Sequence, residues 1–169
     1  MNLSTWVRDE LRDRVVSGRL TVEGAALAYG LIQQESSFDP EESRDEPHIG
    51  DMSRGLGQIL FRTARALGYS GSPDGLFDPR TNLDLTLDYL DKLTRVLSSR
   101  QDVASAYNCG LRTGNGLRVD VPAQGVGPFR SWCGTSAGGF TNSEHVRKVL
   151  LYADRARPLF SCFGDPGLG

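Results

Sequence analysis

The stretch that decides the fold is AALAYGLIQQESSFDP, residues 25–40. Its first eight residues are apolar or small on most faces, which predicts a buried central helix that begins after Thr21 and ends near Ser36. Glu35 stands at the end of this helix, where its carboxyl is expected to be lifted toward the core and stripped of water. Loss of water raises the pKa of a carboxyl, so Glu35 is a candidate general acid. Taken alone, a glutamate near a helix end is more often a solvated surface residue.

Apolar residues at helical spacing predict further helices on both sides of this stretch. They cover residues 5–16, 61–67, 82–98 and 143–157, and Asp102 is expected to cap one more. Strand signals are weak throughout, so the expected fold class is all-α or nearly so, with one domain over residues 1–160. Residues 161–169 are expected to form a loose C-terminal tail.

Three segments are predicted to be loops. Residues 39–55 and 71–75 are polar or rich in glycine. Residues 110–139 lack a sustained period and predict a long irregular loop, either a functional lid or a surface insertion.

Composition excludes several classes of function. The 169 residues carry a net charge of −2, which argues against a nucleic-acid partner. The two histidines, His48 and His145, are far apart and no Cys/His cluster has ligand spacing, so neither a metal nor another cofactor is expected. No segment approaches the roughly 20 apolar residues of a membrane span, and the first residues lack the apolar core of a secretory signal.

The three cysteines, Cys109, Cys133 and Cys162, cannot all pair within one chain. Cys109 and Cys133 could close a loop, but the sequence does not give their distance, and three reduced thiols are an equally good interpretation.

Two short motifs follow Glu35 in order: GLGQI at residues 55–59 and ASAYNCG at residues 104–110. Amide side chains both donate and accept hydrogen bonds, as recognition of sugar hydroxyl and N-acetyl groups requires, and Gln58 and Asn108 supply them. Tyr107 is an aromatic ring with a polar tip, suited to a sugar cleft. Each motif alone is weak, because a glycine pair usually marks a turn and a tyrosine is usually a core residue.

Together with LFDPRTNL at residues 76–83, these motifs resemble the soluble lytic transglycosylase family of the lysozyme-like superfamily. The resemblance covers about residues 20–109 and again about 140–157. It implies that Glu35 is the single catalytic acid and that Ser36 helps to orient its carboxyl. It also implies that the substrate is bound by a set of cleft residues, namely Leu56, Gln58, Tyr107 and Asn108.

The resemblance further implies the reaction. The substrate would be peptidoglycan, and the bond cleaved would be the β-1,4 link between N-acetylmuramic acid and N-acetylglucosamine. Glu35 would act as acid and then as base, leaving 1,6-anhydro ends. The protein would act on the bacterial cell wall, in the periplasm, outside the cell or in a virion, as a monomer unless it belongs to a virion assembly. Its compact format suits a bacteriophage product or a bacterial enzyme without its signal.

The chain departs from the family pattern at three places. Glu35 and Gly55 are farther apart than usual, and one acid of residues 44–51, by preference Asp51, could position a water and give a goose-type hydrolase instead. Gly57 stands where a methionine is common, which predicts a saccharide subsite that is wider or shaped differently. His145 stands where a tyrosine is common and is expected to serve packing. A third alternative is a structural phage component that only binds glycan.

Overall fold

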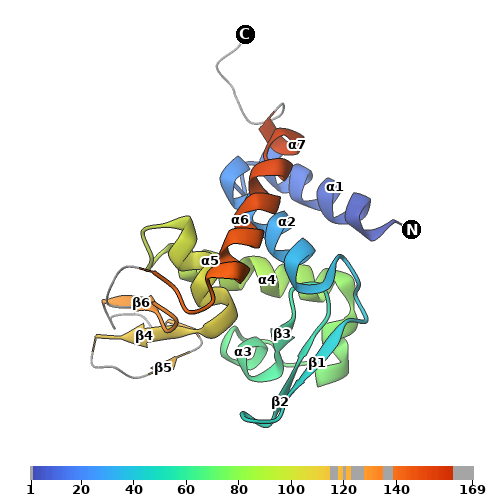
Figure 1. Ribbon diagram of the computed structural model, residues 1–169. Helices are drawn as coiled ribbons and strands as arrows, with labels where there is room; N and C mark the ends of the chain where they lie inside the picture. The colour runs from blue at the N-terminus through green and yellow to red at the C-terminus, as the bar shows by residue number, and fades with distance from the viewer. Residues whose placement is uncertain (1, 115–117, 120, 123–127, 135–138, 162–169) are drawn as a thin grey trace.

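The fold is a bundle of helices built around the pair α2 and α6, which lie side by side at the centre (Figure 1). The computed structural model describes residues 2–114, 118–119, 121–122, 128–134 and 139–161. The α-helices are α1 (Leu3–Val16), α2 (Val22–Ser36), α3 (Phe61–Ala66), α4 (Pro79–Thr94), α5 (Arg100–Cys109), α6 (Ser143–Ala156) and α7 (Pro158–Ser161), and a 3₁₀ turn η1 covers Pro73–Phe77.

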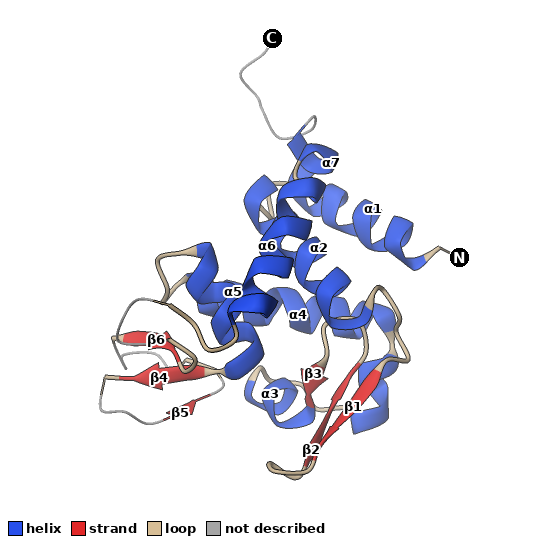
Figure 2. Ribbon diagram, viewed as in Figure 1, coloured by secondary structure: helices blue, strands red, loops and turns tan. Residues whose placement is uncertain are grey.

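The strands form two small antiparallel sheets, drawn in red in Figure 2. The first has the order β1-β2-β3 and the second the order β5-β4-β6. Their bounds are β1 (Ser43–Glu46), β2 (Asp51–Arg54), β3 (Ile59–Leu60), β4 (Leu111–Thr113), β5 (Arg118–Val119) and β6 (Phe129–Ser131).

Helix α2 is the predicted central helix, and its sequence explains its place. Thr21 caps it by accepting a hydrogen bond from the Gly24 N–H at 3.0 Å. Seven of its apolar or small residues are buried, so it presents core on most faces. Gly30 lets α6 approach closely, because a Cβ there would lie 2.6 Å from the Ala153 nitrogen and 2.7 Å from the Val149 oxygen.

The chain leaves α2 through two residues in the left-handed region, Ser37 with φ 53° and Phe38 with φ 67°. Non-glycine residues rarely adopt this conformation, and it persists only where surrounding contacts hold it. The Ser36 hydroxyl supplies one such contact by donating to the Leu56 carbonyl oxygen at 2.8 Å. Phe38 supplies another, because its ring packs 4.7 Å from the ring of Tyr29. The end of α2 is therefore fixed just beyond Glu35.

The all-α expectation is only partly right: helices dominate, but both sheets were missed. Residues 39–55 were predicted to be a loop, whereas β1 and β2 pair in register from Ser43↔Arg54 to Glu46↔Asp51. The hairpin was not predicted because β1 is mostly exposed, β2 is half-buried and both are mostly polar, so their sequences show no alternation of apolar and polar residues. Gly50, with φ 64°, allows the turn between them.

The predicted loop at residues 110–139 is likewise corrected where the structure describes it. β4 pairs with β5 and with β6, and Leu111, opposite Ser131, is fully buried. Strands of two or three residues are too short to give a periodic signal. Residues 115–117, 120, 123–127 and 135–138 lie outside the described residues.

The other helices match their predictions with shifted ends. α4 begins at Pro79, three residues before the predicted start, because Asp78 caps it by accepting from the Thr81 N–H at 2.8 Å. The predicted loop at 71–75 contains the start of η1. Of the predicted tail, Ser161 belongs to α7 and the remainder lies outside the described residues. No helix in the described ranges is long and apolar enough to cross a membrane.

Candidate active site

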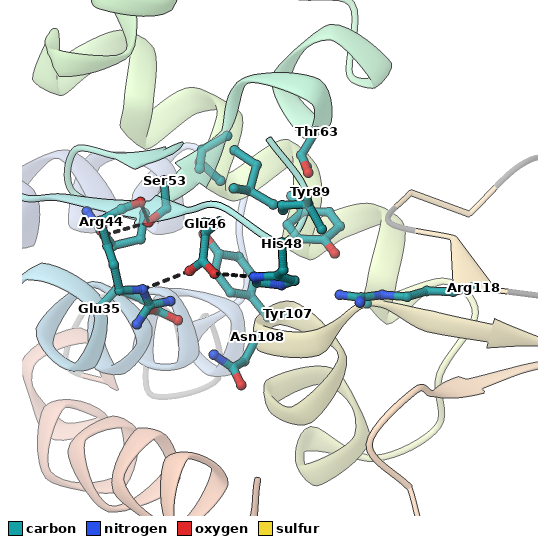
Figure 3. A pocket seen from close by; sticks show the side chains of 15 residues that line it. Glu35, Arg44, Glu46, His48, Ser53, Thr63, Tyr89, Tyr107, Asn108 and Arg118 are labelled. Carbon is teal, nitrogen blue, oxygen red and sulfur yellow. Dashed lines mark hydrogen bonds and ion pairs between the residues drawn. The ribbon is translucent and has the colours of Figure 1, made fainter. Parts of the chain in front are cut away.

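A pocket opens where the C-terminal ends of α2 and α5 meet the two sheets (Figure 3). Glu35 lies on one side of it with Arg44, and Arg118 of β5 extends toward it from the opposite side. The residues that line it are Glu35, Arg44, Glu46, His48, Ile49, Ser53, Gln58, Ile59, Leu60, Thr63, Tyr89, Tyr107, Asn108, Gly110 and Arg118.

Glu35 has the environment of a general acid. Only 9% of its side chain is exposed, and this burial raises its pKa from 4.5 to about 7, against the opposing charge of Arg44. Its carboxyl therefore keeps its proton in weakly acidic solution, where an ordinary glutamate is ionised. The helix end places this protonated carboxyl in a pocket lined by polar side chains.

His145, at the start of α6, faces the Glu35 carboxyl. Its Nε2 lies 3.7 Å from Glu35 Oε1 and has no hydrogen-bond partner among the described residues. The His145 ring also forms a hydrogen bond with the backbone of Ala104. Because Nε2 has no partner, Nδ1 is the donor of that bond, and Nε2 carries an unprotonated lone pair. Burial, followed by the charge of Arg44, lowers the pKa of His145 from 6.5 to about 4.

The contact between His145 and Glu35 is therefore a neutral pair. Between about pH 4 and pH 7 the imidazole of His145 is neutral and the carboxyl of Glu35 is protonated. A protonated carboxyl can donate to a neutral imidazole nitrogen, but at 3.7 Å the two atoms face each other beyond hydrogen-bond distance. The sequence predicted packing for His145 and missed this contact, although its replacement of the usual tyrosine was a signal.

The loop at residues 55–58 is held against α2 and α4 by buried polar groups. Asn82 of α4 is fully buried, and its amide donates to the oxygens of Arg54 at 2.8 Å and Leu76 at 2.7 Å. Its Oδ1 accepts from the Gly57 N–H at 2.8 Å, so each of its polar atoms is paired. Gly55, with φ 72°, has no room for a side chain beside Asn82. Sequence reasoning placed Asn82 in a motif but gave it no role.

The structure places the predicted binding residue Gln58 on the pocket wall with its amide already engaged. Nε2 donates to the oxygens of Glu42 at 2.8 Å and Gly55 at 3.1 Å, and Oε1 accepts from the Ser53 hydroxyl at 2.9 Å. Gln58 thus ties the β1–β2 hairpin to the loop. Its φ of 48° is left-handed, which these bonds help to maintain.

Leu56 and Ser36 lie behind the pocket rather than on its surface. Leu56 is fully buried, and its carbonyl oxygen accepts the Ser36 hydroxyl hydrogen bond. Neither is among the lining residues. Their geometry joins the end of α2, which carries Glu35, to the loop that carries Gln58.

Tyr107 and Asn108 end α5 and both line the pocket. Burial, then the Glu35 charge, raises the pKa of Tyr107 well above 10, so its hydroxyl stays protonated and donates to the Gly57 oxygen at 2.8 Å. Asn108 is exposed, and its Oδ1 accepts from Asn142 at 3.1 Å. Asn108 is therefore a site residue with an amide that reaches solvent.

Comparison with known families identifies the domain. The family described as "Transglycosylase SLT domain" matches residues 22–117, more than half of the chain. The chain belongs to this family. The match includes Glu35, the loop at residues 55–58 and the end of α5, which are the elements that build the pocket.

Two curated relatives support the assignment to the SLT family. The chain is 36% identical over 110 residues to the "Membrane-bound lytic murein transglycosylase C" of Shigella sonnei (strain Ss046), covering 56% of this chain and 28% of that protein. It is 33% identical over 112 residues to the protein of the same name from Haemophilus ducreyi (strain 35000HP / ATCC 700724), covering 57% of this chain and 29% of that protein. The chain thus spans less than a third of the length of these relatives.

The unusual Gly57 of this SLT domain, from which a wider or differently shaped subsite was predicted, packs against Thr86 and Tyr107. A Cβ at this position would lie 2.0 Å from Thr86 Oγ1 and 2.7 Å from Tyr107 Oη. The space is therefore already filled by two hydroxyl-bearing side chains. Glycine is required because the backbone passes directly against them.

The long interval between Glu35 and Gly55 in this SLT domain forms the β1–β2 hairpin, and Asp51 does not line the pocket. Its Oδ1 accepts from the Met52 N–H at 2.7 Å and its Oδ2 from the Arg62 N–H at 3.0 Å, so it stabilises the hairpin. The acid of the hairpin that does line the pocket is Glu46.

Glu46 is held in place by two neighbours on the hairpin. Its Oε1 accepts from Arg44 Nε at 2.8 Å, and its Oε2 lies 3.6 Å from His48 Nδ1. Within the described parts of the chain, no three His, Cys, Asp or Glu side chains come together as metal ligands do.

Proposed function

We propose that this SLT domain cleaves the β-1,4 bond between N-acetylmuramic acid and N-acetylglucosamine of peptidoglycan and leaves 1,6-anhydro-muramic ends. The observation that carries the proposal is Glu35, a buried carboxyl with a pKa of about 7 on the wall of an open polar pocket. The names of the two relatives, both lytic murein transglycosylases, support the same activity.

In the first step the protonated Glu35 donates its proton to the glycosidic oxygen. The bond from this oxygen to the muramic anomeric carbon breaks, and the substrate's own N-acetyl oxygen stabilises the positive charge that develops there. Glu35 is left as a carboxylate in a site that disfavours this form, which makes it a stronger base than a solvated glutamate.

In the second step the Glu35 carboxylate takes the proton of the muramic 6-hydroxyl, whose oxygen attacks the anomeric carbon. His145 favours this return of the proton, because its Nε2 lone pair faces the carboxyl and attracts only the protonated form. One carboxyl thus serves as acid and then as base. We assign His145 as a positioning residue that acts through Glu35.

The remaining predicted residues fall into two groups by their contacts. Asn108 and Gln58 line the pocket, and we propose that both meet sugar hydroxyl or N-acetyl groups, Gln58 only as an acceptor because both N–H groups of its Nε2 are already donated. Tyr107 presents its ring to the same pocket. Ser36 and Leu56 are proposed to support the site from behind through their shared hydrogen bond.

Mass spectrometry of purified peptidoglycan after digestion tests the proposal. We expect muropeptides that are lighter by one water than hydrolytic products and that have no reducing end. A digest without protein sets the background of anhydro ends already present. Soluble products that all carry reducing ends would overturn the transglycosylase assignment, and a folded sample without products would favour the glycan-binding alternative.

Glu35→Gln is the matched control for this digest. The amide is nearly the same size but has no acidic proton to donate, so product formation should fall by at least about 100-fold. Retained binding to insoluble peptidoglycan would show that the variant is folded. Cleavage by Glu35→Gln at the wild-type rate would remove Glu35 from the mechanism.

A hydrolase remains the second candidate, because Glu46 places another carboxylate on the pocket wall. Such a group could position a water against the anomeric carbon. In that case Glu46→Gln would abolish the reducing products. If the domain is a transglycosylase, Glu46→Gln should still release products with anhydro ends.

The proposed unit of function is one catalytic domain over residues 1–160 that acts on the cell wall. A single core cluster supports this, since it reaches from Val7 in α1 to Phe160 in α7. Because the chain spans less than a third of the relatives' length, the proposal concerns this domain alone.

A further inference from the structure

Cys109 and Cys133 are brought together by the second sheet. β4 and β6 pair in the register Leu111↔Ser131, and the Trp132 N–H continues it by donating to the Gly110 oxygen at 2.9 Å. Cys109 is the last residue of α5 and directly precedes this paired region, whereas Cys133 directly follows it, so the two cysteines come to the same end of the β4–β6 pair.

The contacts between the two cysteines agree with this register. The Cys133 N–H donates to Cys109 Sγ at 3.2 Å, and the Cys109 thiol is also hydrogen-bonded to the side chain of Cys133. The Ser131 hydroxyl lies 3.4 Å from the same sulfur. Both thiols are reduced and both residues are partly exposed, so a reagent in solution can reach them.

We propose that Cys109 and Cys133 form a disulfide that ties the end of α5 to the end of β6 under oxidising conditions. The bond would close a loop across a sequence separation of 24 residues. It is independent of the proposed function, because it follows from the pairing of β4 with β6. The disulfide would nevertheless suit the proposed function. Peptidoglycan lies outside the cytoplasm, and disulfides persist in such oxidising surroundings.

The bond forms by two exchange steps with a small-molecule disulfide such as oxidised glutathione. One protein thiolate attacks a sulfur of the oxidant and releases one glutathione thiolate, which gives a mixed disulfide. The other cysteine then attacks the protein sulfur of that mixed disulfide and releases the second glutathione. The two protein thiols lose two electrons and two protons, and the oxidant is reduced to two thiols.

The order of attack follows from the environment of Cys109. Burial, and then the hydrogen bond with Cys133, raises the pKa of the Cys109 thiol to about 11, so it is a poor first nucleophile. Cys133 therefore attacks the oxidant and Cys109 resolves the mixed disulfide. The resolving step is fast because the two sulfurs are already in contact.

The bond would stiffen one wall of the pocket. Cys109 directly follows Tyr107 and Asn108, and the segment it would close includes Gly110 and Arg118, which also line the pocket. A covalent tie at this point limits how far the end of α5 can separate from β6.

The full chain with Cys162→Ser tests the proposal, because only Cys109 and Cys133 can then pair. The protein is incubated with oxidised and reduced glutathione, quenched with an alkylating reagent, and analysed by intact mass and peptide mapping. We expect a loss of two hydrogens, no alkylation, and a cross-linked peptide that contains Cys109 and Cys133. The oxidised chain should melt about 5–10 °C higher than the reduced chain.

Cys133→Ser/Cys162→Ser is the matched control, and its melting temperature should not change with the glutathione ratio. The proposal is overturned if both thiols of folded Cys162→Ser remain alkylated, or if only a stable glutathione adduct forms. It is also overturned if the wild-type bond maps to Cys162. No peptidoglycan is present, so these results are separate from the test of function.

Discussion

At the scale of single residues, the proposed function depends on the protonation of Glu35. The carboxyl holds its proton because it is buried, and the neutral His145 beside it has no proton on the facing nitrogen. This arrangement must reduce stability at high pH. The unfolded chain ionises Glu35 above its ordinary pKa of 4.5, whereas the folded chain resists ionisation until about pH 7.

Glu35→Gln should therefore be more stable than the wild type in alkaline solution. The difference in unfolding free energy should grow as the pH rises from 4.5 to 7 and then level off, reaching about 3 kcal/mol in favour of the variant. Urea unfolding at pH 4.5 and pH 8 measures it. A difference that does not change with pH would show that Glu35 ionises normally in the folded protein.

His145→Phe should lower activity by about tenfold, because the protonated acid loses the lone pair of Nε2 that faces it while the site stays buried. The proton on Glu35 is then held less well, so the alkaline limb of the pH–rate profile should move to lower pH. The His145→Phe substitution leaves the titratable residues that line the pocket in place. They include Arg44 and Glu46 on β1, His48 on the hairpin and Tyr107 on α5. The measurement is the initial rate of peptidoglycan release from pH 4.5 to pH 8.5.

His145→Gln is the control for that experiment, since its amide oxygen is also an acceptor with a lone pair. It should restore most of the rate and return the alkaline limb toward its wild-type position. A merely structural role for His145 would lower both rates without moving either limb.

At the scale of elements, the contact between α2 and α6 brings the acid and its partner together. Glu35 ends α2 and His145 begins α6, so their separation depends on how closely the two helices pack. Gly30 sets this distance, because any Cβ there would strike the backbone of α6.

Gly30→Ala should destabilise the fold by about 1–3 kcal/mol, since the helices must move apart to admit one methyl group. Activity should fall as His145 recedes from Glu35. Gly24→Ala, in the same helix, meets only side chains, Leu20 Cδ1 at 2.9 Å and Thr21 Oγ1 at 3.2 Å, and should be neutral or slightly stabilising. Urea midpoints compare the two variants, and equal effects would contradict the role of Gly30.

At the scale of the whole molecule, the site is assembled from segments far apart in the chain. α2 supplies the acid, α5 the polar wall and α6 the histidine, while the β1–β2 hairpin adds a cation. Arg44 of that hairpin lowers the pKa of both Glu35 and His145, so the hairpin adjusts the acid electrostatically.

Arg44→Gln should raise the pKa of Glu35 and move the alkaline limb of the pH–rate profile to higher pH. The shift should be small, a few tenths of a unit, because the Arg44 side chain is 62% exposed and water screens its charge. Added salt should reduce the difference from the wild type. Arg95→Gln directly after α4, whose charge pairs with Asp91, is the control and should not move the limb.

The sequence supported some of these conclusions by local physics. Apolar spacing and capping residues predicted the main helices, because a helix is stabilised by contacts within a few residues of each other. The run that ends at Glu35 predicted a buried helix with an acid at its end, and the order of the three motifs predicted a family to which the chain belongs.

Tertiary structure alone decided the rest. The strands of the two sheets are short or polar and carry no periodic signal of their own, so neither sheet was predicted. Asp51 was preferred to Glu46 as the acid that could position a water. The sequence does not show that the Asp51 carboxylate already accepts two backbone hydrogen bonds. His145 lies 110 positions from Glu35, since 145 − 35 = 110, and meets it only because Gly30 lets two helices touch. Residue types and local order thus come from the sequence, whereas the pKa and the partner of the acid come from burial and packing.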